Sequence, residues 1–314
     1  MGRQRKRKGD PVHGWLAVDK PVDISSTQVV GKLKRLFNAQ KAGHGGTLDP
    51  LADGILPIAF GEATKTAQWA MDCDKEYVFT IEWGTSTASQ DKEGEVTARS
   101  DVRPSESDIE TLLPKFIGDI QQVPPKYSAI KIDGERAYDL ARDGESFEIP
   151  SRQVTVYEAK LVNVPDADHA VFRVVSGKGF YIRALARDIA HELGTEGHVS
   201  QLRRTRVGAL DETNAVGLSD LEKLAEDKDA LMNQLRPLET VIDDIPQLEI
   251  EAPEAAALKQ GREIVLMPHL VERWRSEANS DDPDRLALTM SDGKAVALGE
   301  VRAGRFQPKK VFQL

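Results

Sequence analysis

Residues 43–54 read GHGGTLDPLADG, and the fold assignment depends on how this stretch is interpreted. Its four glycines predict a loop whose backbone can come close to a ligand. Asp49 precedes Pro50, which disfavours helix and places the aspartate in an extended or turn segment. Its carboxylate can then project into a cleft. Taken alone, however, the pattern is more typical of an Asp-Pro turn between two core segments.

The segments on either side of this loop show strand and helix patterns. Upstream, HGWLAVDKP predicts a strand that ends at Pro21, and Ser25 or Ser26 can cap a following helix. The apolar residues of that helix recur at helical spacing, at Val29, Val30, Leu33, Leu36 and Phe37. Downstream, residues 76–83 read EYVFTIEW and alternate strictly. This alternation predicts a strand with one face formed by Tyr77, Phe79, Ile81 and Trp83.

Further elements predict a mixed core. Ser107 and Glu110 have the spacing of a capping box, which predicts a helix through Phe116. Strands are expected near 153–164 and 170–176. The stretch GKGFYIRALARDIAHEL predicts a helix with an apolar stripe at Ile182, Leu185, Ala186, Ile189 and Leu193. A second face of that helix carries Arg183, Arg187 and His191. The fold class expected is therefore α+β, with a mixed and mainly antiparallel sheet.

The sequence pattern changes near residue 246. Short strand patterns, one short helix (EAAALKQG) and glycine turns follow, interrupted by the polar stretch 275–284, which we interpret as a flexible loop. We therefore expect a disordered basic arm at 1–10, a main domain at 11–245 and a small β-rich domain at 246–314.

Composition narrows the possible functions. The net charge is −9, but residues 1–50 carry ten lysines and arginines against four acidic residues, so residues 51–314 carry −15. A basic end can bind phosphate locally, although its first residues could equally be a solvated tail or, less favoured, a nuclear-localisation patch. No apolar run approaches the roughly 18 residues of a membrane helix. One cysteine, Cys73, and six scattered histidines predict neither a disulfide nor a metal, which fits a cytoplasmic protein.

Six motifs follow one another in a recognisable order. Besides GHGGTLDPLADG, these are WLAVDKPVDISS, KEYVFTIEWG, QVPPKYSAIKIDGERAYDLAR, GFYIRALARDIAHELG and LRRTRVG. From about Gly14 to about Leu224 the chain resembles the TruB family of bacterial tRNA pseudouridine synthases, and the order is more specific than any single motif. The segments LEIEAPEAAALKQGREI and ALGEVRAGRFQPKKVF resemble, more weakly, a PUA-type RNA-binding domain.

The resemblance implies a catalytic centre. Asp49 would be the catalytic carboxylate and Arg183 its cationic partner, while Tyr77 would stack on the flipped uracil and help to move the C5 proton. Without the resemblance, Asp49 would be interpreted as a turn residue, Arg183 as a surface charge or structural salt bridge, and Tyr77 as core packing.

The resemblance also implies residues that bind or shape the RNA. His44 would fill the space that the flipped base leaves, Lys20 would support the catalytic loop, and Tyr181 and Leu202 would line the uracil pocket. The alternatives are a structural histidine for His44, an ordinary exposed lysine for Lys20 and core packing for Tyr181.

The LRRTRVG motif adds three arginines, and four positions depart from the family pattern. Phosphate ligands are expected at Arg203, Arg204 and Arg206, with a solvated basic turn as the alternative. Gly45 stands where threonine is usual, Asp53 where a small hydroxyl residue is usual, Asp23 where glycine is frequent, and Phe180 where threonine is frequent. These departures concern loop shape and RNA contact, not the reaction.

The implied reaction is the conversion of uridine 55 in the T-loop of tRNA to pseudouridine. The base would flip out of the RNA, which costs least where it is not in a regular duplex. Asp49 could attack C1′ of the sugar, add to C6 of the base or remove a sugar proton to give a glycal, and the sequence leaves all three open. After the uracil turns, C5 bonds to C1′ and loses its proton to a base. An isomerisation implies no cofactor.

Three rival interpretations compete with a stand-alone synthase. Asp49 and Asp53 could be the carboxylate pair of a glycoside hydrolase, but four residues in a loop do not fix the separation that such enzymes need. The protein could instead be an RNA chaperone that refolds tRNA, with or without catalysis. A third alternative is the related class that acts with a guide RNA. We expect a stand-alone enzyme without guide RNA, because the region 77–160 matches the bacterial form. We also expect a monomer that binds the T-arm stem-loop and no membrane.

Overall fold

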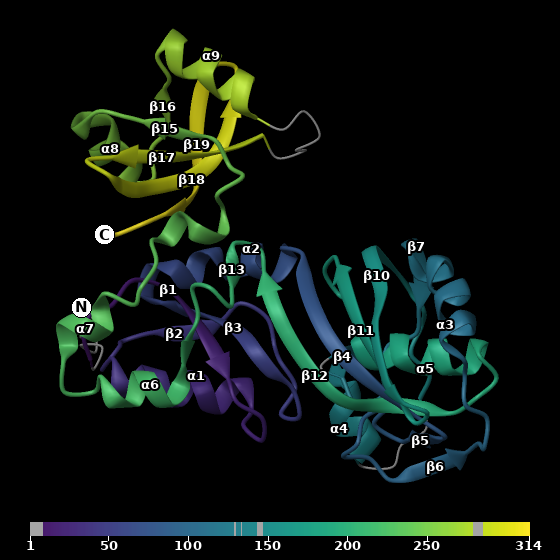
Figure 1. The fold of residues 1–314 in the computed structure, drawn as a ribbon. Coiled ribbons are helices and arrows are strands. Elements are labelled where there is room, and N and C mark those ends of the chain that lie inside the picture. Colours follow the sequence, from purple (N-terminus) through teal and green to yellow (C-terminus); the bar gives the residue numbers. More distant parts are fainter. Residues whose placement is uncertain (1–8, 129, 133, 143–146, 279–284) are drawn as a thin grey trace.

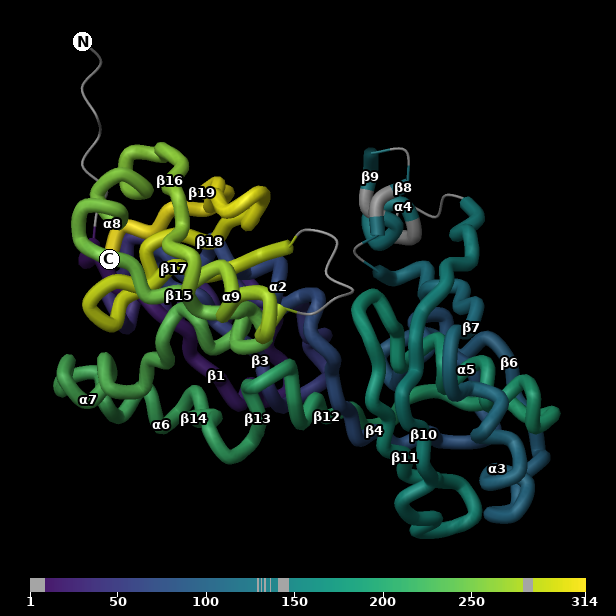
Figure 2. The backbone as a smooth tube through the Cα atoms, turned by 90° about the horizontal axis from the view of Figure 1, so that it is seen from above, coloured from purple at the N-terminus to yellow at the C-terminus, as the bar shows by residue number. Residues whose placement is uncertain are grey.

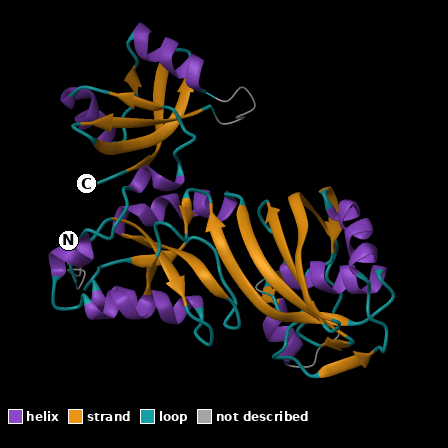
Figure 3. Ribbon diagram, in the orientation of Figure 1, coloured by secondary structure: helices purple, strands orange, loops and turns teal. Residues whose placement is uncertain are grey.

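The computed structural model describes residues 9–128, 130–132, 134–142, 147–278 and 285–314. It contains one large sheet, a second sheet formed by the C-terminal residues, and helices around both (Figures 1 and 3). The predicted α+β class is confirmed, as are the mainly antiparallel sheet and the β-rich C-terminal domain. Of the predicted basic arm, residues 1–8 lie outside the described part of the chain, as do residues 279–284 of the predicted loop.

The large sheet has the order β14-β1-β3-β12-β4-β11-β10-β7, with β2 beside β3 and β13 beside β12. Its strands are β1 (Gly14–Lys20), β2 (Ala42–His44), β3 (Asp53–Phe60), β4 (Lys75–Trp83), β7 (Gly118–Gln122), β10 (Arg152–Asp166), β11 (His169–Ser176), β12 (Gly197–Val207), β13 (Leu210–Asp211) and β14 (Val216–Gly217). Strands β3 and β12 are parallel and share only two residue pairs, Asp53 with Arg203 and Gly54 with Arg204. This short pairing joins two halves of the sheet, and the predicted site residues lie around it.

The periodicity arguments hold for most elements. Strand β4 includes the predicted 76–83, and Phe79, Ile81 and Trp83 on one of its faces are buried. Helix α5 (Ile182–Glu192) buries four residues of its predicted apolar stripe, Ile182, Leu185, Ala186 and Ile189, beside β4 and β12, whereas the fifth, Leu193, is the half-buried C-cap. Helix α1 (Ser26–Leu36) begins after Ser25, which forms a capping box with Gln28.

One predicted cap is wrong. Helix α3 (Glu106–Leu112) begins two residues earlier than expected, and a single 3-10 turn (Leu113–Phe116) continues it. Ser105, not Ser107, is the cap, because its hydroxyl accepts the backbone N–H of Asp108 at 3.2 Å while the Asp108 carboxylate accepts the N–H of Ser105 at 3.3 Å. Both serines are followed three residues later by an acidic residue, so spacing alone could not choose between them.

Shorter elements surround the main sheet. They are η1 (Gly61–Thr66), α2 (Ala67–Asp72), β5 (Thr85–Thr87), β6 (Val96–Arg99), β8 (Lys131–Ile132), β9 (Glu135–Arg136), α4 (Ala137–Arg142), α6 (Leu218–Lys223), α7 (Lys228–Met232) and η3 (Leu238–Val241). Figure 2 shows α4, β8 and β9 standing away from the main sheet. None of the described helices is long and apolar enough to cross a membrane.

The C-terminal sheet has the order β15-β17-β18-β19-β16. Its elements are β15 (Gln247–Glu249), α8 (Ala252–Lys259), β16 (Ile264–Val265), α9 (Pro268–Glu277), β17 (Leu286–Ser291), β18 (Lys294–Arg302) and β19 (Arg305–Val311). Helix α9 was not expected, and its last turn replaces the start of the predicted loop at 275–284. Leu270 and Trp274, one turn apart, bury its apolar side, and the Trp274 indole donates a hydrogen bond to the Leu286 carbonyl at 3.0 Å.

The C-terminal domain packs on the β1–β3 half of the main sheet (Figure 1). One apolar cluster contains Trp15 and Ile55 from the main sheet together with Leu288 and Phe312 from the C-terminal domain. Lys65 of η1 adds a polar contact by donating a hydrogen bond to the carbonyl of Val311 at 2.6 Å. The C-terminal domain is therefore held against the half that carries the GHGGTLDPLADG loop.

The β3–β12 pairing generates a first prediction. Gly54 has a φ of +98°, and a Cβ there would lie 2.2 Å from the Arg204 carbonyl oxygen. Gly54→Ala should lower the free energy of unfolding by at least about 2 kcal/mol, because it adds both backbone strain and a steric clash. Denaturant unfolding followed by circular dichroism measures this loss.

Gly43 offers a matched control for this prediction. It lies in the same motif, has no positive φ, and a Cβ there would meet nothing within 4 Å. Gly43→Ala should therefore change the unfolding free energy by no more than about 0.5 kcal/mol. Equal losses from the two variants would contradict a specific close approach at Gly54.

Candidate active site

The loop that carries Asp49 is held in place by side chains from several elements. The Ser26 hydroxyl donates to the Leu48 carbonyl at 2.8 Å and accepts the Leu48 N–H at 2.9 Å. The backbone N–H of Asp23 donates to the Pro50 carbonyl at 2.8 Å. The loop contains no regular structure of its own, so these contacts fix its course and hence the position of the Asp49 carboxylate.

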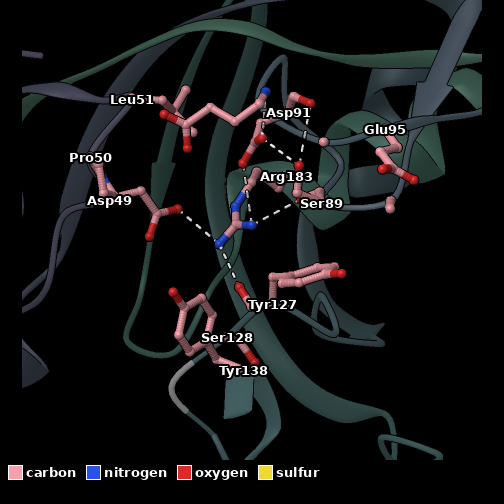
Figure 4. Close-up of a pocket in the computed structure, with 13 residues that line it drawn as sticks. Asp49, Pro50, Leu51, Ser89, Asp91, Glu95, Tyr127, Ser128, Tyr138 and Arg183 are labelled. Atoms are coloured by element: carbon pink, nitrogen blue, oxygen red, sulfur yellow. Dashed lines mark hydrogen bonds and ion pairs between the residues drawn. The ribbon is translucent and has the colours of Figure 1, made fainter. Parts of the chain in front are cut away.

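Arg183 lies at the centre of the site (Figure 4). Its Nη2 is 2.9 Å from Oδ2 of Asp49, and its Nη1 is 3.4 Å from Oδ2 of Asp91. The same two nitrogens donate to the carbonyls of Ser89, at 2.9 Å, and Tyr127, at 3.0 Å. The Arg183 and Asp91 side chains are only 6% and 4% exposed, whereas that of Asp49 is 34% exposed. The guanidinium is thus buried with acceptors at both of its terminal nitrogens, and Asp49 is the carboxylate that faces outward.

Sequence reasoning missed Asp91. It lies in the turn between β5 and β6, where its Oδ1 accepts the Ser89 hydroxyl at 2.5 Å and the Glu93 N–H at 3.1 Å. An aspartate in the polar stretch SQDKEG normally indicates a solvated turn. Nothing in its spacing relates it to a helix some 90 residues downstream, so only the folded chain reveals its contact with Arg183.

Two cavities meet at this ion pair. The smaller, of about 350 Å³, is lined by six of the predicted site residues: Asp49, Tyr77, Tyr181, Arg183, Leu202 and Arg204. The larger, of about 690 Å³, lies between the Pro50–Leu51 segment, the 88–95 turn and residues Tyr127 and Tyr138. Figure 4 shows the residues that line this larger cavity.

The two cavities differ in charge. Besides Arg183, the smaller one is lined by Lys75, Arg152 and Arg204, with Asp49 as its anion. The larger one is lined by four carboxylates, Asp49, Asp91, Glu93 and Glu95, with Arg183 as its cation. Burial, followed by the nearby Asp91 and Asp49 charges, raises the pKa of Glu93 above its ordinary value. A phosphate-bearing ligand is therefore attracted to the smaller cavity and repelled from the larger one.

Aromatic and apolar side chains complete the smaller cavity. Tyr77 is half-buried on β4, directly opposite Arg204 of β12. Tyr181 caps α5, and its backbone exchanges two hydrogen bonds with the Gln122 side chain. The Arg152 guanidinium lies 5.0 Å from the centre of the Tyr181 ring. Leu202, on β12, is buried.

Lys20 lies behind the loop and His44 is half-buried at the end of β2, and neither residue lines either cavity. Lys20 is completely buried, and its ammonium donates to the carbonyls of Pro21 and Ile24 at 2.9 Å and of Pro50 at 3.4 Å. Burial lowers the pKa of Lys20 to about 8, while Asp53 and Asp49 partly oppose this. Burial, and then Arg204, lowers the pKa of His44. Its Nδ1 has no hydrogen-bond partner among the described residues.

The three arginines of LRRTRVG have different surroundings. Arg204 is 2% exposed and donates to the carbonyls of Ile55, Thr47 and Gly46 at 2.8, 3.2 and 3.2 Å. This placement favours support of the catalytic loop over the expected phosphate contact. Arg203 pairs with Asp19, Asp53 and Glu212, and these carboxylates, Asp19 foremost, raise its pKa. Arg206 is half-buried and donates to the Gly208 carbonyl at 3.4 Å.

The four departures from the family pattern have structural explanations. A Cβ at Gly45 would lie 2.6 Å from the Ala70 Cβ, so a larger residue does not fit unless its neighbours shift. Asp53 forms one of the ion pairs of Arg203, at 3.0 Å. Asp23 has a φ of 64°, a conformation that glycine adopts readily and aspartate tolerates. Phe180 lines the smaller cavity.

Comparisons with known proteins show the family of the chain. Residues 34–182 match the N-terminal domain model of the TruB family pseudouridylate synthases, and residues 183–243 match the C-terminal domain model of tRNA pseudouridylate synthase B. A protein named tRNA pseudouridine synthase B from Caulobacter vibrioides is 54% identical over 99% of both chains. One of the same name from Rhizobium johnstonii is 49% identical over 99% of this chain and 100% of its own.

A solved structure extends the likeness to the fold. A chain in the crystal structure of a Cbf5-Nop10-Gar1 complex superposes with a TM-score of 0.71 at 25% identity, covering 99% of this chain and 91% of that chain. Fold and site together define a pseudouridine synthase. The chain belongs to the TruB family of tRNA pseudouridine synthases.

Lys20 gives a pH-dependent prediction. Because its pKa falls from 10.5 to about 8 on folding, the unfolded chain binds more protons than the folded one between about pH 8 and 10.5. The stability of the wild type relative to Lys20→Met should therefore rise with pH over this window, by up to about 3 kcal/mol. Denaturant unfolding of both proteins at several pH values measures the difference.

The exposed Lys34 of α1 provides the control. The difference between the wild type and Lys34→Met should not change with pH over the same window. A pH-independent difference for Lys20→Met would show that the Lys20 ammonium is not destabilised by burial.

Proposed function

We propose that this chain converts uridine 55 in the T-loop of tRNA to pseudouridine. The observation that carries the proposal is the Asp49–Arg183 ion pair at the meeting point of two cavities, one of them cationic and lined by Tyr77 and Leu202. Full-length similarity to proteins named tRNA pseudouridine synthase B supports tRNA as the substrate.

Asp49 is the catalytic carboxylate of this proposal. The reaction breaks the C1′–N1 bond and forms a C1′–C5 bond, while C5 loses a proton and N1 gains one, so no cofactor is consumed. Arg183 orients the carboxylate at 2.9 Å and compensates its charge, and the partly exposed Asp49 can reach a base or sugar in the cavity. Attack at C1′, addition at C6 and formation of a glycal remain alternative routes, and all three use the same carboxylate.

The target base leaves the RNA stack to reach Asp49. In the proposed complex Tyr77 stacks on the uracil and Leu202 and Tyr181 form the pocket walls, all three of which line the smaller cavity. Flipping a base from a loop costs less than flipping it from a duplex. His44 would fill the vacated space, and ring stacking on the neighbouring bases would lower the cost further.

Charge supports the proposed orientation of the RNA. Lys75 and Arg152 line the smaller cavity, and neither is paired with a carboxylate among the described residues, although Lys75 binds the carbonyls of Met71 and Cys73 and Arg152 that of Gly179. Their positive charge can attract the phosphates beside the target nucleotide, whereas the charge of Arg203 is compensated by three carboxylates. Lys20 holds the loop behind Asp49, and Arg206 remains a candidate phosphate contact at the edge. We propose that residues 11–245 form the catalytic domain and residues 246–314 a PUA-type RNA-binding domain, in a monomer that acts in the cytoplasm.

A carboxylate-to-amide substitution tests the mechanism. Asp49→Asn should reduce pseudouridine formation by at least about 10³-fold, because the amide neither attacks carbon nor accepts a proton at neutral pH. Affinity for the T-arm stem-loop should change less than about threefold, since Asp49 is not proposed to bind phosphate. Tritium release from C5-labelled uridine and filter binding measure the two quantities.

Asp53 provides the matched control for this experiment. It lies four residues away, carries the same group and pairs with Arg203 outside both cavities. Asp53→Asn should retain activity within about tenfold, because only the support of the loop is altered. Comparable losses from the two variants would indicate a carboxylate pair, as in a hydrolase, and unchanged activity of Asp49→Asn would refute the assignment.

A minimal substrate tests the independence from guide RNA. The purified protein alone should convert the target uridine in a T-arm stem-loop, and activity should fall steeply with salt because phosphate contacts release counterions. Mass spectrometry of the digested RNA identifies the modified position. Activity that required an added guide RNA would contradict this part of the proposal, and modification at another position would contradict the choice of uridine 55.

A further inference from the structure

Three residues line both cavities at the site: Asp49, Arg183 and Ser128. The first two form the ion pair on which the proposed mechanism depends. Ser128 has no part in that mechanism, yet it lies with the ion pair between the two cavities. Its side chain is 5% exposed, and its Oγ has no hydrogen-bond partner among the described residues.

The backbone around Ser128 is fixed relative to the ion pair. Arg183 Nη2, which contacts Asp49, also donates to the carbonyl of Tyr127, the residue before Ser128, at 3.0 Å. On the other side, the backbone N–H of Tyr138 donates to the Ser128 carbonyl at 3.0 Å. The hydroxyl is thus one peptide unit away from the guanidinium that orients the catalytic carboxylate, and only its own rotation about Cα–Cβ remains free.

A buried hydroxyl without a partner is unfavourable, so a position that keeps one next to a cavity indicates a ligand that completes its bonding. Rotation between staggered rotamers turns Oγ towards the cavity that Ser128 lines. We infer that Ser128 contacts the substrate and that its hydroxyl forms a hydrogen bond with the polar edge of the target uracil. This inference rests on the proposed function and adds a residue that holds the base during the reaction.

The chemistry of the reaction explains why a hydroxyl suits this position. To exchange its N1 link for a C5 link, the uracil turns about the axis through N3 and C6, which exchanges N1 with C5 and O2 with O4. The edge that carries the two carbonyls and the N3–H therefore has the same pattern of donors and acceptors before and after the turn. A serine hydroxyl can donate to a carbonyl oxygen or accept from N3–H. Ser128 can thus make the same kind of hydrogen bond to the uracil as a uridine and again as a pseudouridine, with O2 and O4 exchanging places if the partner is a carbonyl.

A chemical double-mutant cycle tests this contact. The wild type and Ser128→Ala are compared in single-turnover reactions on T-arm stem-loops that carry uridine, 2-thiouridine or 4-thiouridine at the target position. Ser128→Ala should slow the reaction of uridine about tenfold, the value of one lost hydrogen bond. Sulfur is a weaker acceptor than oxygen, so at least one thio substitution should slow the wild type several-fold while leaving Ser128→Ala almost unaffected.

Controls separate a substrate contact from a structural effect. Ser176 is fully buried and its hydroxyl likewise has no partner among the described residues, but it lines neither cavity, so Ser176→Ala should behave as the wild type with all three RNAs. Ser128→Ala should keep the wild-type melting temperature, because the hydroxyl that it removes has no hydrogen-bond partner among the described residues.

The outcomes distinguish the two proposals. The contact would be overturned if each thio substitution slowed the wild type and Ser128→Ala to the same extent. It would also be overturned if Ser128→Ala reacted with uridine as fast as the wild type. A wild type that converts no T-loop uridine would overturn the proposed function, and the contact with it.

Discussion

The site depends on the burial of one positive charge, the Arg183 guanidinium. A buried cation needs both a counter-charge and acceptors for its N–H groups, and removing one partner of such a pair typically costs about 3–5 kcal/mol. Arg183 satisfies this requirement with Asp49, Asp91 and two backbone carbonyls. These acceptors come from separate loops far apart in the sequence. The need to pair one guanidinium therefore brings together the catalytic loop, the β5–β6 turn and the Tyr127 segment.

The two carboxylates on Arg183 are not equivalent. Asp91 is buried and also accepts the Ser89 hydroxyl and the Glu93 N–H, so its oxygens are already occupied. In the described part of the chain, the Asp49 carboxylate contacts no donor other than Arg183, and it is the more exposed of the two. Asp91 thus serves to hold the cation, which leaves Asp49 with free lone pairs directed at the cavities. This difference in hydrogen bonding supports the proposed role of Asp49 on grounds other than the motif.

The sequence predicted the elements whose patterns involve only neighbouring residues. The family motifs predicted the residues that lie together at the site. Alternation in β4 and the stripe of α5 required only neighbouring residues, and the motif order indicated Asp49, Tyr77 and Arg183. Asp91 and Ser128 escaped because their significance comes from contacts across the fold. The different surroundings of Arg203 and Arg204 could not be predicted either. Successive side chains of a strand point to opposite faces, so one pairs with surface carboxylates while the other is buried behind the loop.

The buried cations also explain how an irregular loop can position a catalytic group. Strands and helices satisfy their own carbonyls, but a glycine-rich loop leaves them unpaired and its course undetermined. Here Arg204 binds the carbonyls of Gly46 and Thr47 before Asp49, and Lys20 binds that of Pro50 after it. The positive charges of Arg204 and Lys20 thus fix the course of the loop and do not serve to attract RNA. Net charge is for this reason a poor guide to RNA binding in this chain, since what matters is which cations lie beside a cavity without a carboxylate that compensates their charge.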